Sequence, residues 1–156
     1  MSVAGVRIAG LGGIVRGQVW RPPEPPRVHA QAEFIAQCGR GKRWRGGMPR
    51  THRSAIFPAD YEALLGQRAD VLVTHEAPAC HPYGFAAITE LAQQLGAKTA
   101  FHDHHHDRLD YSEANGRNRF KAVGVGLRGI TDQGGNVIVA GELDEERGDR
   151  KEGIRE

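Results

Sequence analysis

Several features that would narrow the class of this protein are scarce or missing among its 156 residues. The two cysteines, Cys38 and Cys80, form no CxxC pair, which argues against a disulfide framework and a cysteine-ligated zinc site. No apolar run approaches the length of a membrane span and no signal peptide opens the chain, so we expect a cytoplasmic protein without membrane partners. A net charge of only +2 says little about partners. The length suits one domain with its own core.

Acidic residues are absent from residues 34–59, where arginine, lysine and glycine gather instead. Arginine forks suit phosphate oxygens, and Trp44 in the same stretch offers a face on which a base can stack. The stretch therefore predicts either a site for a nucleotide, a nucleic acid or another phosphate-bearing ligand, or a solvated basic loop without a ligand. The candidate phosphate-binding residues are Arg43, Arg45, Arg50 and Arg53.

The opening of the chain lacks the third glycine of a dinucleotide-binding loop. Val6 and Ile8 alternate as in a half-buried strand, but the residues after Gly12 do not open a helix. These glycines therefore indicate sharp turning and close backbone approach. The prolines of residues 22–26 predict an extended connector, and helices are predicted over 29–37 and 58–65.

Histidine is concentrated in one place. Residues 101–107 hold four of the eight histidines and two carboxylates, directly after a short strand predicted over 98–101. In extended chain, alternate side chains share a face, which would place His102, His104 and His106 together and His105 on the opposite side. Imidazole is the commonest side-chain ligand for zinc and related metals. The stretch predicts a metal site or, alternatively, a hydrophilic surface loop.

His75 follows a second predicted strand, over residues 71–74. Apolar residues at three- and four-residue spacing predict an amphipathic helix over 83–95. Together with the strand at 98–101 they make a right-handed β-α-β unit with parallel strands, whose carboxyl ends lie at one edge of the sheet. We therefore expect His75 to lie near the histidine run, although a lone histidine after a strand can also be a hydrogen-bonded structural residue.

Residues 71–78, the helix after them and residues 101–106 resemble the C-terminal half of a calcineurin-like metallophosphoesterase. In that family a core strand ends in a ligand histidine, and a Gly-His-x-His motif follows further along the chain. Here His75 matches the first histidine and residues 103–106 match the motif, with Asp103 in place of its glycine. The resemblance implies that His75 and His104 bind one divalent metal ion and His106 a second, the ions being manganese, iron or zinc.

The same resemblance implies an α/β fold over residues 1–143: an incomplete metallophosphoesterase-type β-sandwich flanked by helices, in which the β-α-β crossover carries the histidines. Residues 123–130 and 136–139 resemble the closing strands of its second sheet. The charged residues 144–156 predict a disordered tail or a frayed helix.

The resemblance is incomplete before His75. The family's Asp-x-His, Gly-Asp and Gly-Asn-His motifs supply a bridging aspartate and further ligands, and none of them precedes His75 here. Two cations held roughly 4 Å apart repel each other unless anionic ligands offset their charge, so three histidines hold such a pair poorly. We expect an N-terminally shortened or degenerate member of the family that holds one metal ion or none by itself. An exposed sheet face and edge then predict self-association.

Two carboxylates, Asp107 and Asp110, follow the histidine run closely. Asp107 and Asp110 either orient a ligand imidazole or lie at the surface as ordinary carboxylates. Residues 115–118 predict a turn into a strand over 119–125.

The sequence predicts two candidate functions. The first function is a metal-dependent phosphoesterase, present as its C-terminal portion, in which a metal-bound hydroxide hydrolyses a phosphate mono- or diester. The second is a non-catalytic module that binds metal and nucleic acid or another anion.

Overall fold

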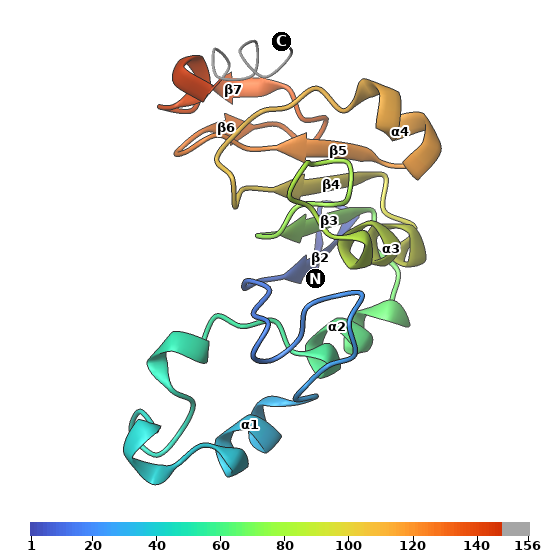
Figure 1. The fold of residues 1–156 in the computed structure, drawn as a ribbon. Coiled ribbons are helices and arrows are strands. Elements are labelled where there is room, and N and C mark those ends of the chain that lie inside the picture. The colour runs from blue at the N-terminus through green and yellow to red at the C-terminus, as the bar shows by residue number, and fades with distance from the viewer. Residues whose placement is uncertain (148–156) are drawn as a thin grey trace.

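A mixed five-stranded sheet lies at the centre of an α/β fold, seen in a computed structural model that describes residues 1–147 (Figure 1). The strands, in the order β1-β2-β3-β4-β5, are Ser2–Val3, Val6–Leu11, Val71–Thr74, Thr99–His102 and Lys121–Gly124. Strands β2 to β5 are parallel, and β1 pairs antiparallel with β2. β6 (Ile130–Thr131) and β7 (Val137–Val139) form a separate antiparallel pair. β5 thus belongs to the main sheet, and only the later strands form a second one.

The α-helices within residues 1–147 include α1 (Gln31–Gln37), α2 (Pro58–Leu65), α3 (Ala86–Leu95) and α4 (Ser112–Asn118). The helices predicted before residue 96 are confirmed, because each carries its local signals. Helix α2 begins at Pro58, and α3 ends where Gly96 adopts a left-handed φ of 69°. Within residues 1–147 no helix is both long enough and apolar enough to cross a membrane.

One face of the sheet carries the main core. Ala9, Leu72, Ala100 and Ala122 lie side by side across β2 to β5 and are buried against the apolar stripe of α3. The small side chains let the helix approach the sheet closely. The β3-α3-β4 crossover with parallel neighbouring strands, predicted from the sequence, is confirmed.

The opposite face of the sheet is partly exposed, with Val71 and Val123 buried. Val73 points to this face, since side chains alternate along a strand, and it is 45% exposed. It lines an apolar groove of about 470 Å³ together with Ile8, Val71 and Phe101. The predicted exposed sheet surface is therefore found.

The chain leaves the sheet between β2 and β3. Figure 1 shows this excursion extending beyond β2, with α1 and the 3-10 turns Arg40–Lys42 and Arg50–His52. A small core of Val19, Val28, Ala55 and Phe57 holds it together. A backbone bridge between Ile14 and Ala55 ties its two ends beside each other.

One prediction near the C-terminus needs correction. Residues 115–118 belong to helix α4 rather than to a turn, and the Asp110 carboxylate accepts from the backbone N–H of Ser112, the first residue of the helix. The Asn115 side chain is occupied by the N–H of Ala122, which ties α4 to β5. Residues 144–147 form a helical turn, and the rest of the predicted tail, 148–156, lies outside the described residues.

Candidate functional site

His75 and His104 meet at the carboxyl edge of the parallel sheet. Thr74 at the end of β3 is paired with His102 at the end of β4, so the residues after the two strands emerge next to each other. The backbone N–H of His104 donates to the carbonyl of His75 at 3.0 Å. The two rings stack with centroids 4.6 Å apart and planes inclined by 21°. The crossover thus brings together two of the three histidines that the resemblance selected.

Each of these rings is held at Nδ1 by a carboxylate. His75 Nδ1 lies 2.7 Å from Asp103 Oδ1, and His104 Nδ1 lies 3.0 Å from Glu76 Oε2. Glu76 is only 3% exposed, and its other oxygen accepts from the backbone N–H of Val15 at 2.7 Å. A carboxylate that accepts from Nδ1–H leaves the Nε2 lone pair available, which is how metal-bound histidines are commonly supported. In the neutral tautomer with the proton on Nδ1, both rings can ligate a metal ion through Nε2.

A second group of histidines adjoins the pair. The ring of His105 lies 4.8 Å from that of His104 and stacks at 4.0 Å on His81, which is buried. His81 Nε2 lies 3.3 Å from a carboxylate oxygen of Asp107. Asp107 thus lies against His81, which was not among the predicted ligands, and Asp110 is an exposed carboxylate that accepts from Ser112.

His102 is the most enclosed imidazole of the cluster. It is 2% exposed, and neither ring nitrogen has a hydrogen-bond partner within the described residues. Burial, with a smaller contribution from the charge of His81, lowers the pKa of His102 to about 4. Burial likewise lowers the pKa of His105 to about 4. Both rings are neutral near pH 7, the form in which imidazole binds metals.

The predicted alternation of faces is wrong beyond His102. β4 ends at that residue, and the next residues form a turn in which the N–H of His106 donates to the carbonyl of Asp103 at 2.9 Å. The rings of His104 and His105 consequently stack beside each other instead of lying on opposite faces. His106 has a positive φ of 47° and takes part in none of the ring contacts found for residues 1–147. The structure does not join it to the pair.

Four residues of the cluster were missed as site residues by the sequence reasoning: Glu76, His81, His102 and His105. Glu76 and His81 lie in the loop after β3, as His75 does. For Glu76, which is buried in the structure, the available sequence signal was an acidic residue between a histidine and a proline. The alternation of faces assumed for residues 102–106 placed His105 on the opposite side from His104, so His105 was not selected as a site residue. Asp103, considered only as a substitute for glycine, is the partner of His75.

The cluster fits part of a metal centre. No group of three or more histidine, cysteine or carboxylate side chains is arranged to hold a metal ion in the portion of the chain that the structure describes. The oriented pair supplies two nitrogen ligands, while zinc sites generally use three or four protein ligands. A groove of about 450 Å³ opens beside His75 and Asp103 and is lined on its other side by Gly10 and Gly12.

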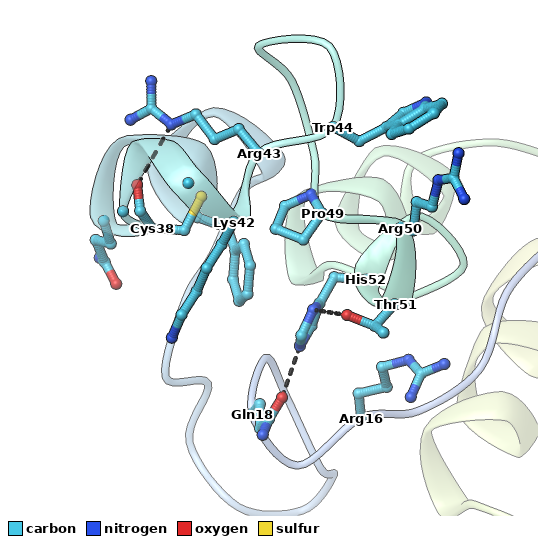
Figure 2. A pocket seen from close by; sticks show the side chains of 14 residues that line it. Arg16, Gln18, Cys38, Lys42, Arg43, Trp44, Pro49, Arg50, Thr51 and His52 are labelled. Carbon is cyan, nitrogen blue, oxygen red and sulfur yellow. Dashed lines mark hydrogen bonds between the residues drawn. The ribbon is translucent and has the colours of Figure 1, made fainter.

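The four arginines predicted to bind phosphate do not share one site. Arg43 and Arg50 line a pocket of about 890 Å³ in the excursion between β2 and β3 (Figure 2). Arg53 instead lines a separate shallow hollow, which Arg50 also borders. Arg45 lies 5.2 Å from the centre of the Trp44 ring and lines neither space. The sequence did not single out Arg16, which joins the pocket from the segment after β2.

Comparisons with known proteins identify a relative without a described activity. An uncharacterized protein of Haemophilus influenzae is 43% identical over 139 residues, which cover 89% of this chain and 60% of the relative. The chain therefore spans about 60% of the length of the relative that it matches. No family model matches the chain. No solved structure matches it either.

Proposed function

We propose that this chain carries histidine ligands of a metal-dependent phosphoesterase of the calcineurin-like type, which hydrolyses a phosphate mono- or diester. The observation that supports the proposal is the His75–His104 pair, with each Nδ1 held by a carboxylate. Two such imidazoles at the carboxyl ends of adjacent parallel strands are suited to ligand binding, since this edge of an α/β sheet is where ligands commonly lie. We further infer that the main sheet and the β6–β7 pair are parts of a metallophosphoesterase-type β-sandwich.

In this proposal His75 and His104 hold one divalent ion, which is manganese, iron or zinc, and His106 serves a second. Bound ions of this kind supply a hydroxide nucleophile and offset the charge that develops on the phosphate. Asp103 and Glu76 keep the two imidazoles in the ligating tautomer, and the N–H of Val15 keeps the Glu76 carboxylate in place. His81 and Asp107 support His105 beside the pair.

The bridging aspartate of the family has no counterpart in this sequence before His75. We therefore assign catalysis to the whole protein and to this chain the binding of one ion or none by itself. The groove beside His75 and Asp103 is the space proposed for the phosphate ester.

The test combines metal binding with turnover on tag-free protein. We expect Mn²⁺ or Zn²⁺ to bind, and binding to be lost in His75→Ala and in His104→Ala. His29→Ala is the matched control, because His29 is exposed and pairs with Glu62 away from the cluster. Hydrolysis of a generic phosphodiester in Mn²⁺, at any rate above background, should depend on the same two residues. Metal binding that survives the double replacement would remove the basis of the proposal.

A non-catalytic metal- and anion-binding module is the second candidate, and the pocket of Figure 2 favours it. Its lining includes arginine and lysine but no acidic residue. The two candidates differ in one observable. A module of this kind retains anion binding in the presence of a chelator and shows no turnover, whereas the esterase needs the ion.

A further inference from the structure

We propose that the pocket between residues 16–18 and 34–52, hereafter the basic pocket, binds a nucleoside phosphate independently of the histidine cluster. The pocket has a volume of about 890 Å³, at the upper end of the size range usual for small-molecule sites. Its walls come from the segment after β2, from α1 and from both 3-10 turns. The proposal goes beyond the phosphoesterase function and does not require it.

The charge of the basic pocket favours an anion. Its cationic lining residues are Arg16, Lys42, Arg43 and Arg50, and none of the fourteen lining residues is acidic. Within residues 1–147 none of these four cations forms a salt bridge with a carboxylate. Uncompensated charge of one sign on concave walls focuses the field and raises the local concentration of anions.

Arg50 is positioned to bind phosphate oxygens. Its guanidinium carbon lies 3.4 Å from the centre of the Trp44 ring, in a cation–π contact. The N–H donors of a guanidinium lie in its plane, so stacking on a ring leaves them free for bidentate hydrogen bonds. Trp44 thus restricts the motion of Arg50 without occupying its donors.

Gln18 is oriented by a chain of hydrogen bonds, which Figure 2 shows. Thr51 Oγ1 lies 2.9 Å from Nδ1 of His52, and Nε2 of His52 lies 2.6 Å from Oε1 of Gln18. Burial and the nearby charge of Arg16 lower the pKa of His52, which favours the neutral ring. With Thr51 donating to Nδ1, the Nε2–H donates to the Gln18 oxygen. The amide nitrogen of Gln18, a donor, then remains for a ligand.

The apolar lining is the reason for proposing a nucleoside phosphate as the ligand and not inorganic phosphate alone. Phe34 and Pro49 provide apolar surface within the same pocket as the cations, next to Trp44, over whose ring Arg50 already lies. The ring of Phe34 is packed against His52 at 4.5 Å and against Phe57, so it is a fixed wall rather than a mobile side chain. Aromatic faces bind bases by stacking whatever their sequence, while cations bind the phosphate.

The test is a calorimetric titration of the full chain with adenosine monophosphate in the presence of EDTA, so that no metal at the histidines contributes. Arg16→Gln and Arg50→Gln should each weaken binding roughly tenfold, because a charge-assisted hydrogen bond is lost. Arg27→Gln and Arg40→Gln are matched controls, since they remove the same charge from the excursion between β2 and β3 but do not line the basic pocket. They should change affinity less than twofold, roughly, as expected for screened charges.

Two further measurements guard against variants that fold poorly. Gln18 is exposed, so Gln18→Glu should leave the fold intact while its new negative charge weakens binding. Adenosine monophosphate should also change the tryptophan fluorescence, and Trp44→Phe should abolish the change. Inorganic phosphate should bind more weakly than the nucleotide, and adenosine more weakly still.

Three results would overturn the proposal. The first is the absence of saturable binding by adenosine monophosphate in wild-type protein. The second is equal weakening by all four arginine replacements, which would indicate diffuse charge. The third is a strong preference for an oligonucleotide over the mononucleotide, which would indicate a nucleic-acid surface.

Discussion

At the scale of single residues, Glu76 connects the histidine pair to the excursion. Its two oxygens accept from His104 Nδ1 and from the N–H of Val15, and the side chain is 3% exposed. Arg16, a wall of the basic pocket, is the next residue after Val15. One buried carboxylate therefore joins the segment that borders the basic pocket to the proposed metal ligand.

Replacing Glu76 by alanine should destabilise the protein. The change leaves the N–H of Val15 and the His104 ring without their buried acceptor, at a cost of roughly 1–3 kcal/mol in the free energy of unfolding. Urea denaturation measures the change. Glu90→Ala, on the exposed side of α3, is the control and should be nearly neutral. Equal stability of Glu76→Ala and wild type would contradict the buried network.

The Arg7–Asp70 pair predicts an acid dependence of stability. Hydrogen bonds from Arg7 lower the pKa of Asp70 to about 2. Because this pKa is below that of the unfolded chain, near 3.9, the stabilisation is present at higher pH and is lost as pH falls from about 4 towards 2. The thermal midpoints of wild type and Asp70→Asn, recorded by circular dichroism, should differ at pH 6 and converge as the pH is lowered. A difference independent of pH would contradict this assignment.

At the scale of elements, the sequence predicted the features that depend on residues close together in the chain. Helix α2 carries a proline start and a glycine end, α3 carries a regular apolar spacing and a glycine end, and the crossover followed from α3. The turn after β4 could not be predicted, since it depends on where the strand ends, and neither could the carboxylate partners. Asp103 is 28 residues from His75, so their contact exists only once β3 and β4 pair. Helix α4 was not predicted, because its asparagine and glycine residues favour turns when considered alone.

Gly116 tests α4 directly. It lies inside the helix with open space around the position of a Cβ atom. Gly116→Ala should therefore raise the free energy of unfolding by roughly 0.5–1 kcal/mol, since alanine is the better helix former. Gly96→Ala is the matched opposite, because its φ of 69° is left-handed, and it should destabilise by about 1 kcal/mol. Destabilisation by both replacements would indicate a turn at residues 115–118.

At the scale of the whole molecule, the two faces of the sheet are covered unequally, since Val71 and Val123 on the face opposite α3 are buried but Val73 on the same face is exposed. The β6–β7 pair exposes Ile138, which is 65% exposed. Exposed apolar surface commonly marks an interface.

We expect the isolated chain to self-associate through this face. Val73→Lys places a charge in the apolar groove and should shift the population towards monomer, as measured by light scattering after size-exclusion chromatography. Gln94→Lys adds the same charge on the exposed side of α3 and should have no such effect. A wild-type chain that is monomeric at all concentrations would contradict the expectation.

The most direct test of the central claim is a histidine-selective ¹⁵N NMR titration of tag-free protein with Zn²⁺. We predict that the Nε2 signals of His75 and His104 shift together on addition of the ion, while their Nδ1 atoms stay protonated and bonded to Asp103 and Glu76. Shifts confined to other histidines, or binding through Nδ1 of this pair, would contradict the account.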